Sequence, residues 1–186
     1  MDTINILLMG DEKCHKTNII LYYVRGEFTE KYSPTLDDDF SKTIEFEGQE
    51  ITIKISDSDI YSASVHQLRQ RSISKYDAFI FLYSTEDLIS LMKLKDDYNE
   101  IKEVKKRFPC VIGAVKTSDK PDEVPISEGR SFAEMVGCQV VEVNVKENTG
   151  INELFDELLK ALKNSLTNSS KKPSKKGKKK DGCYVQ

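Results

Sequence analysis

Apolar positions along the chain gather in short runs separated by polar segments, a pattern that predicts alternating strands and helices. Four near-continuous apolar runs are short enough to be buried strands. They cover residues 4–9, 78–83, 111–115 and 140–143. Two further runs, 40–46 and 51–55, flank Glu47-Gly48-Gln49. Their apolar residues fall mostly at every second position around a glycine-containing turn, which predicts a hairpin.

Helical spacing of apolar residues predicts helices between these strands. The predicted helices cover 17–24, about 85 to 108, 127–136 with Ser127 as N-cap, and 150–166. Strands that alternate with helices, with one early hairpin, are typical of an α/β protein. We therefore expect a six-stranded, mostly parallel sheet with helices on both faces.

The carboxyl ends of the predicted strands carry the polar residues that bear on function. Parallel sheets bind ligands at the carboxyl ends of their strands. Gly10, Asp57, Lys116 and Asn144 follow four different strands. We expect these four residues to lie at the same edge of the sheet.

The first of these strand ends opens a phosphate-binding motif over residues 10–17. A glycine, four residues and then Gly-Lys-Ser/Thr at a helix start surround phosphates with backbone N–H groups, with the lysine on the phosphates and the hydroxyl on Mg²⁺. Gly10, Lys16 and Thr17 hold their places, and Lys13 lies inside the loop. His15 stands where the second glycine belongs.

A histidine at position 15 brings a Cβ and an imidazole to a point where the backbone approaches phosphate. The side chain must clash, tilt the loop or occupy the space of the phosphates. Two interpretations stay open: a protonated His15 contacts phosphate, or His15 fills a loop that binds none. Glu12 adds a carboxylate nearby, which repels an anion unless it points away.

Composition and charge are those of a globular protein with a heavily charged surface. The 186 residues carry a formal net charge of −3. Seven lysines lie in the last sixteen residues, so the preceding body is strongly acidic. They are Lys171, Lys172, Lys175, Lys176, Lys178, Lys179 and Lys180. An acidic body does not favour nucleic acid, whereas the tail is suited to phosphates of any kind.

Other sequence features exclude several classes of protein. No apolar run approaches the ~18 residues of a spanning helix, and the first residues lack the basic start of a signal peptide, so we expect a cytosolic chain. The four cysteines form no CxxC pair and only two histidines are present, which favours neither a disulfide framework nor a zinc site. We expect reduced thiols, with Cys110 in the core.

At this point the chain resembles the Ras-like small GTPases over nearly its whole length. Residues 26–40 are similar to the first switch and effector segment of that family. The resemblance implies that Thr35 contacts Mg²⁺ and the γ-phosphate and that Phe28 packs against the base. It also implies an effector surface. Its residues are Tyr32, Pro34, Leu36, Asp37, Asp38 and Phe40.

The second switch departs from the family pattern. The family has Asp-x-x-Gly followed by a glutamine that orients the attacking water. In this chain Asp57 is kept, and by resemblance it holds Mg²⁺ together with Thr17 and Thr35. Ile60 replaces the glycine and Tyr61 replaces the glutamine, so no catalytic residue is assigned.

The motifs that read the base are also altered. Where the family has Asn-Lys-x-Asp, this chain has Val115-Lys116-Thr117-Ser118-Asp119, so the carboxylate is displaced by one residue. Asp119 reaches a base only if the loop bulges. In the later motif Lys146 is retained. We therefore expect GTP or GDP with Mg²⁺ as the ligands by resemblance, with weak discrimination of guanine.

The tail gives a second, independent indication. Cys183-Tyr184-Val185-Gln186 matches a prenylation box that favours a farnesyl group. One lipid chain binds membranes marginally, and the lysine run supplies the second attraction, to anionic lipid. The remaining alternatives are a basic tail with an unmodified cysteine and nuclear targeting by the lysines.

These observations predict a Ras-like domain over 1–166 and a disordered polybasic tail over 167–186. The expected function is a monomeric signalling GTPase, anchored to the cytoplasmic side of the plasma membrane, with GTP hydrolysis very slow or absent. Effectors would bind residues 32–40, and exchange and activating factors are further partners that the resemblance implies. The alternative is a pseudo-GTPase that binds no nucleotide and presents the effector segment at a membrane. A third hypothesis, a fully hydrolysing switch, requires that His15 and Ile60 do not impair turnover.

Overall fold

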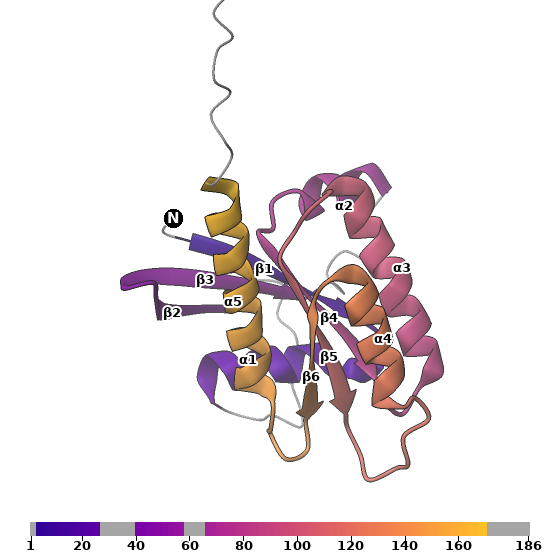
Figure 1. The fold of residues 1–186 in the computed structure, drawn as a ribbon. Coiled ribbons are helices and arrows are strands. Elements are labelled where there is room, and N and C mark those ends of the chain that lie inside the picture. The colour runs from indigo at the N-terminus through magenta and orange to yellow at the C-terminus, as the bar shows by residue number, and fades with distance from the viewer. Residues whose placement is uncertain (1–2, 27–39, 58–65, 171–186) are drawn as a thin grey trace, which may run out of the picture.

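A computed structural model describes residues 3–26, 40–57 and 66–170, which form one six-stranded sheet with helices on both faces (Figure 1). The strand order is β2-β3-β1-β4-β5-β6. Only β2 is antiparallel to its neighbour, so the predicted α/β class and hairpin are confirmed. The strands are β1 (Thr3–Gly10), β2 (Phe40–Phe46), β3 (Gln49–Asp57), β4 (Ala78–Ser84), β5 (Cys110–Lys116) and β6 (Gln139–Asn144).

The helices divide into two layers, each with its own hydrophobic core. Their bounds are α1 (Lys16–Arg25), α2 (His66–Ile73), α3 (Leu88–Val104), α4 (Ile126–Val136) and α5 (Ile151–Ser170). Helices α1 and α5 pack on one face of the sheet, where the rings of Tyr23 and Phe155 stack with centroids 3.7 Å apart. Helices α3 and α4 cover the other face (Figure 1).

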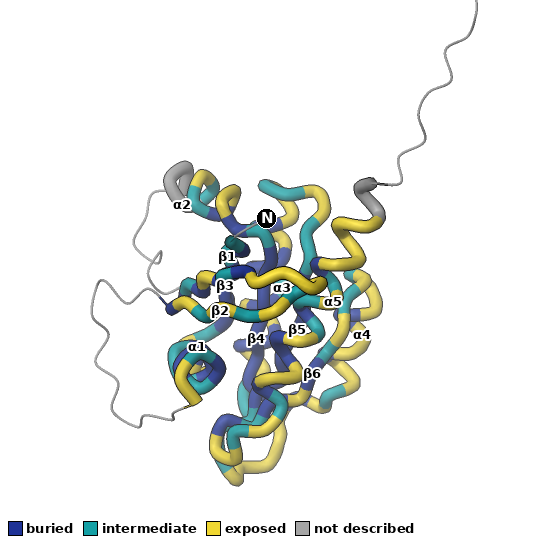
Figure 2. Tube along the Cα trace, turned by 90° about the vertical axis from the view of Figure 1, so that its left-hand side faces the viewer, coloured by how far each residue is buried: buried dark blue, intermediate teal, exposed yellow. Residues whose placement is uncertain are grey.

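The central strand β4 shows why the sheet forms here. All seven of its residues are buried, and the burial colouring of Figure 2 shows this strand running through the interior. A strand buried on both faces needs apolar residues at every position, which is what the sequence Ala-Phe-Ile-Phe-Leu-Tyr-Ser supplies almost throughout. The apolar run was therefore sufficient to predict this strand.

Four predicted helix ends in α3, α4 and α5 differ in the structure. Helix α3 begins at Leu88, because Asp87 caps it by accepting a hydrogen bond from Ile89 N at 3.0 Å, and it ends at Val104 rather than near 108. Ser127 is wrong as an N-cap, since α4 begins at Ile126 after Pro125. Helix α5 extends to Ser170. Helix ends depend on caps and on tertiary contacts, which periodicity alone does not reveal.

Helix α2 was not predicted. Its sequence His-Gln-Leu-Arg-Gln-Arg-Ser-Ile has two apolar residues and no continuous apolar stripe. Ile73, 2% exposed, anchors its end in the core that α3 and α4 share. None of the helices in the described part of the chain has the length and apolar character needed to cross a membrane.

Candidate phosphate and cation site

The four predicted strand-end residues do lie at one edge of the sheet. Gly10 ends β1, Asp57 ends β3, Lys116 ends β5 and Asn144 ends β6, and these four strands run parallel. Gly10 is required by the close approach of β4, because a Cβ there would lie 2.6 Å from the carbonyl oxygen of Leu82. Its φ of +148° also favours glycine.

Residues 11–15 form a tight loop whose backbone N–H groups bond within the loop. The 3₁₀ helix η1 (Glu12–Cys14) is capped by Asp11, whose Oδ1 accepts from Lys13 N at 3.2 Å. Cys14 N donates to Asp11 O at 3.0 Å, and His15 N donates to Glu12 O at 3.3 Å. These amides are the donors that a phosphate would need, so bound phosphate must compete with the loop's own acceptors.

Lys16 lies inside this loop. Its side chain is 1% exposed, and Nζ donates to Gly10 O at 3.1 Å and to Asp11 O at 3.2 Å. The carboxylate of Asp57 lies 3.8 Å from Nζ. A buried ammonium requires such partners, because an unpaired buried charge is costly. The two carbonyl oxygens and the Asp57 carboxylate hold the side chain of Lys16, the first residue of α1.

Thr17 and Asp57 are brought together from segments forty residues apart. Thr17 Oγ1 donates to Asp57 Oδ2 at 2.9 Å, and Asp57 is 6% exposed. A hydroxyl and a carboxylate are the hard oxygen ligands that Mg²⁺ accepts, usually with phosphate oxygens and water completing the site. The donor set therefore fits a magnesium ion bound next to phosphate.

The structure places His15 at a strained backbone position with its ring outside the loop. Its φ of 50° and ψ of 43° are left-handed, which costs a residue other than glycine roughly 1 kcal/mol or more. The His15 side chain is exposed, and its Nδ1 lies 3.4 Å from the side-chain nitrogen Nδ2 of Asn18. His15 thus has a left-handed backbone conformation, which glycine adopts most readily.

Two ion pairs tie the phosphate loop to α3. Lys13 Nζ lies 2.7 Å from Asp87 Oδ2, and Lys93 Nζ lies 3.3 Å from Asp11 Oδ2. The hydrogen bond from Lys13 holds the pKa of Asp87 below its ordinary value. Lys13 therefore bonds to α3 through Asp87, and Glu12 is exposed.

Cys14 lies underneath the loop and anchors it. Its side chain is fully buried in the core shared with α1 and α5, and burial raises the pKa of its thiol to about 12. This thiol behaves as a small apolar side chain.

Side chains of the two loops that would read a base form ion pairs within and between these loops. Lys116 Nζ pairs with Asp122 at 2.8 Å and donates to Lys120 O at 3.0 Å. Asp119, whose side chain is 84% exposed, forms a short ion pair with Lys146. Asp119 and Lys146 are thus brought together as predicted site residues, next to the strand ends of β5 and β6.

Known proteins have sequences similar to this chain over most of its length. The sequence model of the Ras family matches residues 5–164. The mouse GTP-binding protein Di-Ras2 is 32% identical over 157 residues, which cover 81% of this chain and 77% of that protein. Human GTP-binding protein Di-Ras1 is 29% identical and Ras-like protein 2 of Mucor circinelloides f. lusitanicus 26%, over 156 residues and the same shares of both chains. The chain belongs to the Ras family.

Within this Ras family chain, Glu86 is a residue of the site that the sequence did not indicate. Its carboxylate accepts from Thr117 N at 3.1 Å and from Ser118 N at 2.8 Å. It also accepts from the hydroxyls of both residues, at 3.2 and 2.9 Å. Ser118 stands where the family has its base-reading aspartate, so Glu86 supplies a carboxylate next to that position. The sequence feature that could have indicated Glu86 is the position of this acidic residue, two residues after the end of the buried strand β4.

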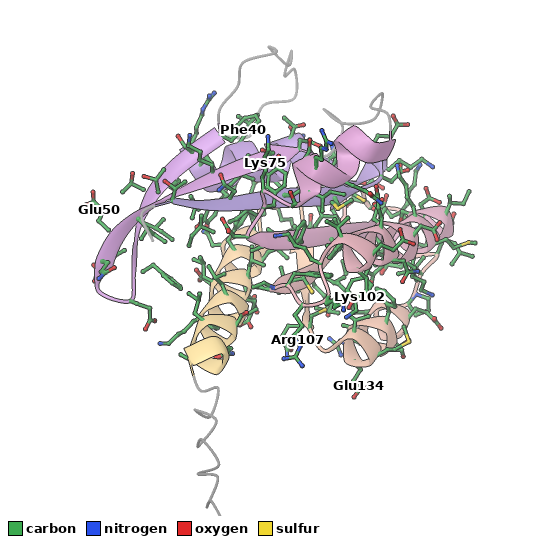
Figure 3. The ribbon with its side chains drawn as sticks, turned by 90° about the horizontal axis from the view of Figure 1, so that it is seen from above. Phe40, Glu50, Lys75, Lys102, Arg107 and Glu134 are labelled. Atoms are coloured by element: carbon green, nitrogen blue, oxygen red, sulfur yellow. The ribbon has the colours of Figure 1, made fainter. Side chains whose placement is uncertain are left out.

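The remaining predicted residues of this Ras family chain lie outside the described residues. They are Phe28, Tyr32, Pro34, Thr35, Leu36, Asp37, Asp38, Ile60, Tyr61 and Cys183. Phe40 is described: it begins β2 (Figure 3), is 5% exposed and packs in the core shared with α1 and α5. An effector that approaches this point would meet the edge of β2 rather than the ring of Phe40.

Proposed function

We propose that this Ras family protein binds GTP and GDP with Mg²⁺ at residues 10–17 and that it hydrolyses GTP very slowly or not at all. The observation that carries the proposal is the cluster of Lys16, Thr17 and Asp57. These three residues are held together at 2.9 to 3.8 Å. The names of the relatives support a guanine nucleotide, since Di-Ras1 and Di-Ras2 are GTP-binding proteins by name.

Each residue has a separate task in this proposal. Lys16, which is buried and bonded to two carbonyl oxygens, would place its ammonium against the β- and γ-phosphates. Thr17 would supply an oxygen ligand for Mg²⁺, Asp57 would hold the ion through water, and Thr35 would be a further ligand. When bound, the metal neutralises charge on the phosphates.

Slow hydrolysis follows from the residues that would orient water. The family glutamine is Tyr61 in this chain, and a phenol does not place water as an amide does. Ile60 replaces the glycine that senses the γ-phosphate. We expect the affinity for nucleotide to be lowered as well. Phosphate must replace Asp11 and Glu12 as the acceptor of the backbone N–H groups of residues 13–15.

Weak base selectivity is part of the same proposal. Two carboxylates lie near the base-reading loop, but Glu86 already accepts four hydrogen bonds and Asp119 is paired with Lys146. A guanine must displace one of these partnerships to be recognised. We expect a smaller preference for GDP over ADP than a free aspartate would give.

Membrane attachment through prenylated Cys183 and the lysines of 171–180 completes the proposal. Effector proteins would bind through residues 32–40. Membrane attachment is tested by flotation of prenylated protein with anionic and neutral vesicles. Binding to anionic vesicles that requires both the lipid and the lysines supports the anchor, whereas equal binding of Cys183→Ser contradicts it.

The nucleotide proposal is tested by calorimetric titration of the full chain with GDP, GTP and ADP, with and without Mg²⁺. We expect saturable binding that falls at least about tenfold without Mg²⁺ and in Thr17→Ala, because each change removes one contact to a charged group. Thr43→Ala, an exposed threonine on β2, is the matched control. The absence of saturable binding would overturn the proposal.

The second candidate is the pseudo-GTPase, and the bonded loop amides favour it. In that case the loop of residues 11–15 is a permanent structure and not a binding site. Mass spectrometry of small molecules released from protein extracted from its own cells separates the two candidates. Bound GTP or GDP contradicts the pseudo-GTPase.

A further inference from the structure

Cys110 is the first residue of β5, and Cys138 directly precedes β6, the parallel neighbour of β5. Val111 of β5 pairs with Gln139 of β6, and each cysteine precedes one of these residues. Adjacent strands lie about 4.8 Å apart. A disulfide needs a Cα separation of roughly 4.4 to 6.8 Å, so the register brings the two cysteines within bonding range.

Both side chains lie on the same face of the sheet. Cys110, Ile112 and Ala114 belong to the core shared with α3 and α4. Val140 of β6 and Cys138, directly before that strand, pack against the same core. Strand side chains alternate between faces, so these positions place both sulfurs on one side. The two thiols lie close enough to shift each other's pKa, downward for Cys110 and upward for Cys138.

A cavity gives solvent access to this pair. It measures about 910 Å³ and is lined by both cysteines together with side chains of α3, α4 and α5. It lies where β5 and β6 begin, at the opposite end of the sheet from Gly10 and Asp57. Cys110 is 8% exposed and Cys138 is half-buried, so small reagents in the cavity reach the sulfurs.

Most of the charged residues that line this cavity are basic. Lys102, Lys106, Arg107 and Lys160 line it, with Glu157 as the acid, which pairs with Lys160 at 2.7 Å. Figure 3 shows Lys102 and Arg107 near each other between α5 and α4. The hydrogen bond from Cys138, opposed by burial and aided by Lys102, lowers the pKa of Cys110. The same hydrogen bond and burial raise the pKa of Cys138.

This arrangement differs from that of Cys14. Cys14 is sealed in the core and its pKa is raised to about 12, so it has no thiolate to offer. The Cys110 thiolate has a stabilising donor, a nearby cation and an open cavity. A second thiol lies beside it to resolve a first oxidation product.

We propose that Cys110 and Cys138 form a reversible dithiol–disulfide pair, a modification site that hydroperoxides oxidise through the cavity between α3, α4 and α5. The Cys110 thiolate attacks the terminal peroxide oxygen, the O–O bond breaks, and the leaving oxygen takes a proton as water or alcohol. Cys110 is then a sulfenic acid. Cys138, losing its proton, attacks that sulfur, forms the S–S bond and expels water. Two thiols are oxidised by two electrons and one peroxide is reduced; a thiol reductant reverses the reaction.

The test is peroxide treatment of the full chain carrying Cys183→Ser, which removes the tail thiol. Non-reducing peptide mapping should reveal one intramolecular link between Cys110 and Cys138, with Cys14 unmodified and the link lost on thiol reduction. Cys110→Ser and Cys138→Ser should each abolish it. Two thiols that stay alkylatable, or that oxidise separately without a link, would overturn the proposal.

A second probe does not depend on oxidation or on the serine variants. Phenylarsine oxide binds two adjacent thiols together, because soft thiolates are strong ligands for such centres. The Cys183→Ser chain should take up one equivalent of the arsenical, and prior oxidation should prevent this. Failure to take up arsenic contradicts the adjacency of the thiols.

The rate of disulfide formation tests the contribution of Lys102. Lys102→Gln should slow disulfide formation about twofold by reducing the thiolate fraction, whereas Lys160→Gln, the matched control, should leave the rate unchanged.

Discussion

The loop between β5 and α4 depends on one carboxylate, and its removal is a direct test of the site. Glu86 follows β4 and accepts two backbone N–H groups and two hydroxyls from Thr117 and Ser118, at 2.8 to 3.2 Å. Glu86→Ala leaves both amides without this acceptor. We expect the loop of residues 116–122 to loosen and the whole domain to lose stability.

The magnitude follows from the exposure of the groups. A hydrogen bond to a charged acceptor contributes roughly 1.5 to 3 kcal/mol, and water replaces part of it because Glu86, Thr117 and Ser118 are half-buried. The free energy of unfolding should therefore fall by about 2 kcal/mol. For a domain of this size that corresponds to roughly 4 to 8 °C in Tm.

The dependence on pH gives a second signature. Burial raises the pKa of Glu86, but the donors of Ser118 and Thr117 outweigh it and hold the pKa below its ordinary value. A lowered pKa in the folded state stabilises the protein above the unfolded pKa of about 4.3, and this is lost as pH falls through the folded value. The difference between Glu86→Ala and the unchanged protein should be full at neutral pH and shrink in acid.

Thermal unfolding followed by circular dichroism measures this effect, and hydrogen exchange at the Thr117 and Ser118 amides localises it. Glu123→Ala, an exposed glutamate of the same loop, is the control and should change stability by less than about 0.5 kcal/mol. Two results together would show that the carboxylate does not hold the loop. They are an equal Tm of Glu86→Ala and Glu123→Ala at neutral pH, and unchanged exchange rates of the Thr117 and Ser118 amides.

Three further predictions concern the phosphate loop. Asp57→Asn should lower the free energy of unfolding by about 2 kcal/mol in urea titrations, because it removes the carboxylate beside the buried Lys16; an unchanged midpoint would contradict that pairing. His15→Gly should raise nucleotide affinity about tenfold in calorimetry, by freeing the loop to turn toward phosphate, and should change stability by less than about 1 kcal/mol because relief of strain and unfolded-state entropy oppose each other. Lys13→Ala should leave Tm at neutral pH within about 2 °C, since exposed ion pairs contribute little; a larger loss would show that the pair with Asp87 braces the loop.

The sequence alone determined the class of fold and the edge of the sheet where a ligand would bind. Six apolar runs gave the six strands, because a strand buried on one or both faces must be apolar in that pattern. Gly10, Lys16 and Thr17 marked the phosphate loop because the chemistry of that loop depends on residue type and short spacing. Asp57 was found from the end of its strand.

The tertiary structure decided which of these groups meet, and several of its contacts had no sequence signal. Helix α2 is held by the burial of Ile73 and not by an apolar stripe. Glu86 reaches Thr117 and Ser118 because β4 and β5 are neighbours, and Cys110 meets Cys138 because of the register of β5 with β6. The internal bonding of residues 11–15 is likewise a property of the folded loop. The local pattern of apolar residues indicates which surfaces must be buried. Contacts between distant residues depend on strand order and register, which no short stretch of sequence encodes.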